Sequence, residues 1–392
     1  MRRVLAFILA LILFVGVVLG YNTYLNKSID KYKLYLKSEN LYSKAGAKDV
    51  FEAVLDKNTI LLLGSSEFNY DKTLDMNYFP TEFFNQGGYE TNIAILGAGG
   101  TQSLYHAITV AALSEDLQSK KVALIVSPQW FTEEGVAKDA FAGNFNGDTY
   151  LAAMENKTLP KELKEKIAER TETLLEGMDE KALEQVKENN SVSVEETKNL
   201  VKKISIAIQS DFMTLKAKRD VAKKIPEEAK TFKIEKKPAG EPDFSAMLAD
   251  AEATGKEKTS NNTFGIHNSY FEQYVKADLA ESRGISAYST CPPSKEREDL
   301  QLFLDVCKAT GVEPLLIGVP FSGIWYDYIS FPKAEREKQY QVIREVAAEN
   351  KVQLADLYGH EGEMYFLSDV MHIGWKGWVY IDESLYRFAK KN

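Results

Sequence analysis

Three residues near opposite ends of this 392-residue sequence carry the side chains of a serine nucleophile system. Ser66 ends the segment Gly64-Ser65-Ser66, which follows the apolar run 60–63, and Asp369 lies three residues before His372. A serine hydroxyl is a weak nucleophile until a histidine accepts its proton and a carboxylate orients that histidine. These residue types predict acyl chemistry on Ser66, with His372 as general base and Asp369 as its partner.

Short apolar segments alternate with helical patterns along the chain and predict the elements that position these residues. Continuous apolar strands separated by helices are typical of a parallel sheet that is covered by helices on both faces. We therefore predict an α/β fold, a three-layer arrangement of a parallel sheet flanked by helices. The expected strands are 59–63, 91–96, 122–127, 313–319 and 352–357, and the expected helices are 103–117, 300–310 and 333–350.

The predicted strands end near residues that are able to bind a substrate. In an open parallel sheet, the ligand crevice lies beyond the carboxyl ends of the strands. An alternative interpretation is that glycine and serine follow strands because chains turn there. Asp369 and His372 favour the functional interpretation. The residues that follow predicted strands, and therefore fall at this one edge, are Ser66, Gly99-Gly100, Gln129 and Pro320-Phe321-Ser322.

Four motifs together give the chain a family resemblance. The serine and the Asp-x-x-His segment resemble the SGNH (GDSL-type) hydrolases, although Ser65 stands where those enzymes usually have an aspartate. The G-x-S-x-G elbow of α/β-hydrolases is absent because Phe68 replaces its last glycine. The whole set more closely resembles the DltD family, membrane-anchored proteins of teichoic acid D-alanylation in Gram-positive bacteria. Its motifs occur here, in the same order, at 64–67, 99–103, 127–130 and 369–378.

The SGNH resemblance implies candidates for the oxyanion donors. In that pattern the oxygen that becomes negative in the transition state is held by the nucleophile's amide, a glycine after strand two and an asparagine after strand three. Gly100 is the first choice for the glycine and Gly99 the second. The asparagine is missing, and Gln129, with the same amide on a longer stem, is its substitute. The alternative for Gln129 is a turn residue beside Pro128.

The DltD resemblance also implies a function. It implies an extracytoplasmic serine acyltransferase of the cell wall that transfers D-alanine to lipoteichoic acid through an acyl intermediate on Ser66. The implied partners are lipoteichoic acid, a membrane acyltransferase and other proteins of the D-alanylation pathway. Two alternatives stay open. One is a thioesterase or esterase that removes D-alanine from a mischarged carrier, and the other is a non-catalytic docking subunit for the membrane acyltransferase.

Residues 1–21 have the composition of a membrane anchor. Residues 4–20 carry no charge, and at about 1.5 Å per residue they cover roughly 26 Å of a hydrocarbon core. Arg2 and Arg3 precede them, which predicts a single-pass anchor in the cell membrane with a cytoplasmic N-terminus and an extracellular catalytic domain. The alternative is a signal peptide that is cleaved near Gly20.

Changes of composition divide the rest of the chain. Residues 22–57 are polar, with apolar residues at helical spacing, and are expected to form a helical stalk. Residues 58–148 and 291–392 are expected to form the two parts of the catalytic domain. Between them, residues 149–290 predict a mainly helical insertion that flanks the ligand edge. Its apolar positions at helical spacing include Leu163, Ile167, Leu174, Leu175, Val201, Ile204 and Ile208.

Other residue types narrow the function further. Trp130, Trp325 and Trp375 are expected in loops at the catalytic edge, as a substrate surface or, alternatively, as core residues. The four histidines show no metal-site spacing, so neither a metal nor a cofactor is expected. With 48 Lys and Arg against 57 Asp and Glu, the net charge of −9 argues against nucleic acid as a partner. The apolar helical face around Cys307 favours free thiols over a disulfide with Cys291.

Overall fold

Five parallel strands form the centre of the molecule, in the order β2-β1-β3-β4-β5. β1 (Thr59–Gly64) pairs with β2 (Asn92–Gly97) on one side and with β3 (Lys121–Val126) on the other. β4 (Glu313–Gly318) and β5 (Gln353–Asp356) extend the sheet beyond β3. The predicted parallel α/β sheet is therefore confirmed. The structure, a computed structural model, describes residues 2–44, 48–69, 78–194, 215–216, 218–227, 229–233 and 240–391.

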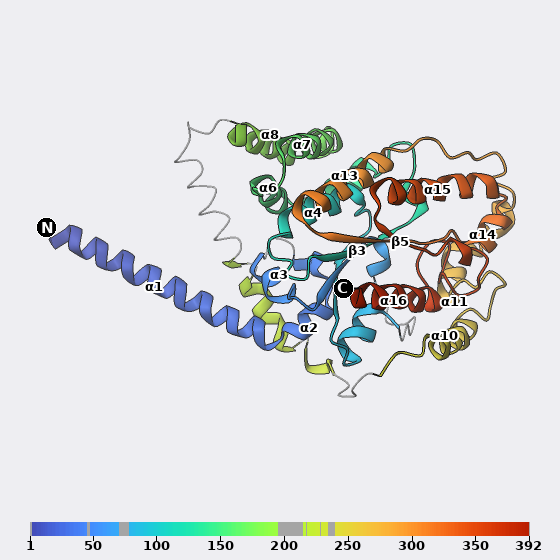
Figure 1. Cartoon of the computed structure of the whole chain (residues 1–392), viewed down its shortest axis with the longest axis horizontal. Coiled ribbons are helices and arrows are strands. Elements are labelled where there is room, and N and C mark those ends of the chain that lie inside the picture. Colours follow the sequence, from blue (N-terminus) through green and yellow to red (C-terminus); the bar gives the residue numbers. More distant parts are fainter. Residues whose placement is uncertain are drawn as a thin grey trace.

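Alternate residues of β1 face two helical layers. Leu61 and Leu63 belong to one hydrophobic core and Ile60 and Leu62 to the other. Because side chains alternate along a strand, a fully buried strand requires cover on both faces of the sheet. Figure 1 shows the helices of the two layers on either side of the strands. The first layer contains α4 (Ser103–Leu113), α13 (Lys295–Thr310) and α15 (Lys333–Asn350), and the second contains α16 (Trp375–Lys390) and α10 (Phe244–Lys258).

Local sequence signals set the bounds of α13, the helix that packs most closely on α4. The side chain of Ser294 accepts a hydrogen bond from the amide of Glu296 at 3.1 Å, which caps the first turn. The helix ends at Gly311, whose φ of 68° lies in the left-handed region that glycine tolerates best. These signals bring the carboxylate of Glu296 into the first turn of α13, beside α4.

A long apolar helix precedes the sheet. α1 (Arg2–Lys31) contains an 18-residue window with a mean hydropathy of 2.9 and no buried residue. Among the described residues it is the one helix that is long and apolar enough to cross a membrane. Its last turns bury Leu25 and Ile29, and Lys218 donates hydrogen bonds to the side chains of Asn22 and Asn26 at 2.7 and 2.8 Å. This apolar helix could therefore anchor the folded part of the chain to a membrane.

The expected helical stalk is part of the folded core. Residues 33–54 form α2 (Lys33–Ser38), the short helix η1 (Leu41–Lys44) and α3 (Lys48–Val54). Leu36 and Val54 are fully buried in the same core as β1 and α4. The segment is helical, as expected, but it does not form a free stalk, because its apolar residues cover the β2 edge of the sheet.

The expected insertion consists of helices, as predicted, but they lie in two separate places. Three of them cover the outer side of α4 and α13 (Figure 1), where Ile167, Leu174 and Leu175 are buried. Val201, Ile204 and Ile208 lie outside the described residues. The helices that follow α10 in the chain continue towards the carboxyl ends of the strands. The insertion helices are α6 (Gly147–Glu155), which begins two residues before the expected boundary, α7 (Lys161–Leu175), α8 (Glu180–Val194), η6 (Ala229–Thr231), α10, α11 (Asn268–Tyr270), η7 (Phe271–Val275) and α12 (Leu279–Ser282). α5 (Lys138–Asn144) lies before them, in the first part of the catalytic domain.

Short helices follow β1, β3, β4 and β5 at the carboxyl edge of the sheet, and a further one precedes β2. This edge points towards α14 and α11, at the end of the molecule away from the tip of α1 (Figure 1). The edge therefore brings together loops from both halves of the sequence. The short elements are η2 (Ser66–Phe68) after β1, η4 (Thr81–Gln86) before β2, η5 (Pro128–Trp130) after β3, α14 (Gly323–Tyr328) after β4 and η8 (Tyr358–His360) after β5.

Candidate active site

Ser66, His372 and Asp369 form a continuous chain of hydrogen bonds at the carboxyl edge of the sheet. His372 Nε2 lies 2.9 Å from Ser66 Oγ, and His372 Nδ1 lies 2.8 Å from Asp369 Oδ2. Because a carboxylate only accepts, we assign the proton of the neutral ring to Nδ1, which leaves Nε2 to accept from the serine hydroxyl. The three predicted residues are thus within the contact distances of a serine nucleophile system.

The loop that carries Asp369 and His372 orients both side chains. Asp369 is buried, and its Oδ1 accepts the amides of Met371 and His372 at 2.8 Å each. Burial of His372 opposes its protonation, but the hydrogen bond and charge of Asp369, together with the charge of Glu67, outweigh burial and raise the pKa of His372. The surroundings therefore favour the imidazolium that forms when His372 accepts a proton.

Ser65 holds the end of β1 against the loop that follows β2. Its side chain donates to the carbonyl of Ala98 at 3.1 Å and accepts the amide of Gly100 at 3.1 Å, and the residue is 4% exposed. Thr101 Oγ1 adds a hydrogen bond to the carbonyl of Gly64 at 2.8 Å. Ser65 is therefore engaged inside the fold, whereas the hydroxyl of Ser66 points to His372.

The contacts of Gly100 argue against its expected role as an oxyanion donor. Its amide already donates to Ser65 Oγ, and its φ of 85° lies in the left-handed region. Gly99 lies beside the nucleophile, since a methyl group added to it would be 3.8 Å from Ser66 Cβ. Asn144 Nδ2 donates to the Gly99 carbonyl at 2.8 Å and fixes the Gly99–Gly100 peptide. The geometry favours the second choice, Gly99, over the first.

Gln129 contacts the loop of the Asp-His pair. Its Nε2 donates to the carbonyl of Val370 at 3.3 Å, so the structure uses the side-chain amide to hold residue 370. The amide of Gln129 in turn donates to Ser127 Oγ at 3.3 Å, which is the capping contact of η5. One of the two N–H groups of this amide is thereby engaged, so Gln129 helps to position the loop that carries Asp369 and His372.

Two of the three tryptophans expected at a substrate surface are core residues. Trp130 is 8% exposed and Trp375 is 2% exposed. Their large apolar rings fill space beneath the loops that carry Gln129 and His372, so the expectation of a substrate surface is wrong for both. Trp325 is half-buried, with ring centroids 5.6 Å from Phe264 and 5.8 Å from Tyr328. Of the three, Trp325 alone retains a partly accessible ring.

Glu67 is a residue of the site that the sequence reasoning did not single out. Its Oε1 accepts the amide of Ser65 at 2.8 Å. Burial raises its pKa, and hydrogen bonds from backbone amides and the charge of His372 oppose that rise. Its place in the 64–67 motif, directly after Ser66, is the signal in the sequence that pointed to it.

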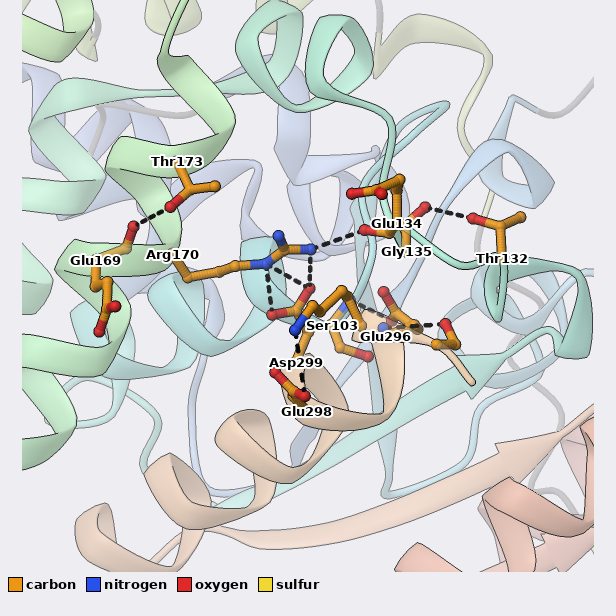
Figure 2. A network of polar contacts seen from close by, with 12 residues as sticks. Ser103, Thr132, Glu134, Gly135, Glu169, Arg170, Thr173, Glu296, Glu298 and Asp299 are labelled. Atoms are coloured by element: carbon orange, nitrogen blue, oxygen red, sulfur yellow. Dashed lines mark hydrogen bonds and ion pairs between the residues drawn. The ribbon is translucent and has the colours of Figure 1, made fainter. Parts of the chain in front are cut away.

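A second group of polar residues supports the start of α4, which follows the Gly99-Gly100 loop. Figure 2 shows Arg170 of α7 between Asp299 of α13 and the carbonyl of Glu134, with contacts of 3.0 to 3.2 Å. Glu296 Oε1 accepts the amide of Ser103 at 3.0 Å (Figure 2). Burial, then the charge of Asp299, raises the pKa of Glu296 to about 8. This network joins the insertion, α13 and the loop beside Ser66.

The described residues contain no group of three or more His, Cys, Asp or Glu side chains able to hold a metal ion. Cys291 and Cys307 are both buried and are not bridged to each other. Burial raises the pKa of the Cys291 thiol to about 11.

His106 is fully buried, and its Nε2 lies 2.9 Å from the carbonyl of Gly64 at the end of β1. His106 is therefore a core residue that supports the strand before Ser66.

Comparison with known proteins identifies the family. The family model described as DltD protein matches residues 37–390. A Protein DltD from Bacillus subtilis (strain 168) is 29% identical over 341 residues, which span 86% of this chain and 83% of the relative. Another from Staphylococcus aureus (strain NCTC 8325 / PS 47) is 29% identical over 337 residues, spanning 84% of this chain and 80% of the relative. A third, from Lacticaseibacillus rhamnosus, is 24% identical over 369 residues, spanning 91% and 81%. Because the match extends from α2 through His372 to α16, the chain belongs to the DltD protein family.

Proposed function

We propose that this protein is a serine acyltransferase that transfers D-alanine to lipoteichoic acid through an acyl intermediate on Ser66. The observation that carries the proposal is the pair of hydrogen bonds at His372, 2.9 Å to Ser66 Oγ and 2.8 Å to Asp369 Oδ2. A histidine aligned in this way turns the serine hydroxyl into a nucleophile at neutral pH. Membership of the DltD family supports D-alanine as the acyl group and lipoteichoic acid as the acceptor.

The first half of the reaction loads Ser66. His372 Nε2 takes the hydroxyl proton while Oγ attacks the carbonyl carbon of the D-alanyl donor. The carbonyl oxygen becomes negative and is received by the amides of Ser66 and Gly99; a single such donor is typically worth about 10²–10³-fold in rate. The tetrahedral intermediate then collapses, His372 returns its proton to the leaving group of the donor, and D-alanine remains as an ester of Ser66.

The second half uses the same groups in reverse. A hydroxyl of lipoteichoic acid gives its proton to His372 Nε2 and attacks the acyl carbon, and the Ser66 Oγ–acyl bond breaks as Ser66 regains a proton. Asp369 stays ionised and stabilises the imidazolium in both halves. Water that occupied the acceptor position would release free D-alanine instead, so transfer depends on exclusion of water from the site.

The proposed extracellular location of the catalytic domain follows from the charges at the start of α1. Arg2 and Arg3 precede the apolar helix, and the bias of positive charge towards the cytoplasm favours an extracellular catalytic domain. Lipoteichoic acid, a membrane acyltransferase and other D-alanylation proteins are the proposed partners. The catalytic edge lies at the end of the molecule away from the tip of α1 (Figure 1), so an acceptor that extends from the membrane is better suited than a lipid headgroup at its surface.

The decisive experiment uses full-length protein in detergent with a D-alanyl donor and purified lipoteichoic acid. Transfer predicts a D-alanyl ester of Ser66, followed by polymer-bound D-alanine that depends on the acceptor. Release of free D-alanine alone in the presence of abundant acceptor would favour the thioesterase or esterase. A Ser66 that reacts with neither a fluorophosphonate nor the donor would favour the docking subunit.

A further inference from the structure

Glu67 is a carboxylate beside the nucleophile that the proposed reaction does not use. It follows Ser66 in η2, and its Oε1 accepts the amide of Ser65 at 2.8 Å. A side chain at Gly64 would collide with Oε1, so the carboxylate lies over the end of β1. Glu67 retains partial solvent exposure. Its carboxylate is therefore held in one place at the end of β1.

The charge of Glu67 has two opposite effects on acyl chemistry at Ser66. It favours the imidazolium of His372, as Asp369 does. It also opposes the negative oxygen that develops on the carbonyl next to Ser66, because like charges close together raise the energy of the transition state. An anion in this position impairs attack on an uncharged acyl group. It becomes favourable when the acyl group carries a positive charge of its own.

An aminoacyl ester carries such a charge on the carbon next to the acyl carbon. Its α-ammonium has three N–H donors and requires an acceptor once the site excludes water. Asp369 is not available for this role, because Oδ2 contacts His372 and Oδ1 accepts two amides. In Glu67, Oε1 accepts the Ser65 amide. The buried side-chain atoms without a hydrogen-bond partner, among the described residues, do not include the second oxygen, Oε2.

We propose that Glu67 determines substrate specificity by accepting the α-ammonium of the aminoacyl group on Ser66. This assignment rests on the proposed acyl transfer and adds the feature of the substrate that the site recognises. The ammonium neutralises the carboxylate, which removes the repulsion on the oxyanion and holds the acyl carbon near Ser66 Oγ. An acyl group of the same size without the amino group leaves the anion uncompensated.

The groups around Glu67 define how its action should vary with pH. The titratable groups that act on it or on its neighbours are His372, Asp369 and, through Asp369, Tyr270. Burial raises the pKa of Glu67, so Glu67 loses its charge at a higher pH than an exposed glutamate does. Recognition of an ammonium should therefore weaken as the pH falls through the pKa of Glu67.

The test compares D-alanyl and propionyl thioesters, which differ by the amino group. Full-length wild type, Glu67→Gln and the control Glu133→Gln are assayed for acylation of Ser66. Glutamine keeps an acceptor for the Ser65 amide, and Glu133 is an exposed carboxylate on the loop after β3. We expect wild type and control to prefer D-alanyl, and Glu67→Gln to lose roughly 10- to 100-fold of that preference while its propionyl rate is maintained or rises. The preference should fall at acidic pH in wild type and stay constant in Glu67→Gln.

Two outcomes would overturn the assignment. An equal loss with both thioesters in Glu67→Gln would make Glu67 a positioning residue for the Ser65–Ser66 turn. An unchanged preference would show that another group accepts the ammonium. In either case acylation of wild-type Ser66 would leave the proposed function standing, whereas a wild-type Ser66 that reacts with neither thioester nor a fluorophosphonate would overturn both proposals.

Discussion

Ser66 Oγ lies 2.9 Å from His372 Nε2, although the two residues are 306 positions apart in the chain. The contact forms because Ser66 follows the end of β1 by two residues while the loop before α16 returns to the same edge of the sheet. Asp369 and His372 are close in sequence and need only one turn to meet. The nucleophile reaches them only through the complete sheet, so the site depends on the packing of both halves of the chain.

The first prediction concerns the two neighbouring serines. We expect Ser66→Ala and His372→Ala to lower D-alanyl transfer at least about 10³-fold, since each removes a member of one catalytic unit. Ser65→Ala should retain more activity, because Ser65 ties the Ala98 carbonyl to the Gly100 amide and does not contact His372. Labelling with a fluorophosphonate and thermal melting would be measured together. Loss of labelling in Ser65→Ala, with Ser66→Ala still labelled, would contradict this order.

The second prediction concerns the pH dependence of Ser66 labelling. His372 must be neutral to accept the serine proton, and its pKa is raised in the wild type. Labelling should therefore increase as the pH rises through that elevated pKa. Asp369→Asn removes the hydrogen-bonded anion, so the midpoint should move to lower pH while the maximal rate falls, by as much as about 10⁴-fold in comparable triads. A midpoint that does not move would mean that Asp369 does not act on the charge of His372.

The third prediction concerns Glu296, which supports the first turn of α4. Its pKa is about 8 in the folded protein against an ordinary value of 4.5, so the folded state binds this proton more tightly than the unfolded state. Its contribution to stability is complete below pH 4.5 and is lost progressively as the pH rises to about 8. Thermal melting of wild type and Glu296→Gln at pH 5 and pH 9 should show the variant gaining relative stability at the higher pH. Glu298→Gln, at an exposed neighbouring carboxylate, is the control and should show no such gain.

The fourth prediction concerns membrane orientation. Protease added to intact protoplasts should degrade the folded domain that follows Tyr21, because Arg2 and Arg3 favour a cytoplasmic N-terminus. A cytoplasmic protein in the same sample should resist the protease until the cells are lysed. Protection of the domain in intact protoplasts, followed by degradation after lysis, would reverse the proposed orientation.

The fifth prediction concerns the exclusion of water. Phe264 packs on Trp325 and Tyr328, in the cluster that also contacts Val370 beside Asp369. We expect Phe264→Ala to raise the ratio of free to polymer-bound D-alanine several-fold, since water gains access to the acyl-serine. Tyr274→Ala is the control, because Tyr274 is 61% exposed in the same part of the chain. An equal loss of both products in Phe264→Ala would mean that the cluster supports folding and does not shield the site.

The sequence by itself determined the fold class and the three residues that meet at the sheet edge. Apolar runs such as 122–127 report burial on both faces directly, and Asp369 and His372 form a motif within one turn. The order of strands and helices then requires the loops after β1 and β3 to share an edge. These properties depend on local periodicity and on topology, both of which a single sequence carries.

Only the tertiary structure decided how each polar group and each ring is used. The sequence favoured Gly100 over Gly99, but the Gly100 amide donates to Ser65, which follows the neighbouring strand β1. Gln129 donates to Val370 from the far end of the chain, and Trp375 is buried by residues that are distant in sequence. Hydrogen-bond partners and burial arise from long-range packing, whereas spacing along the chain reports only which residues share a turn or a face.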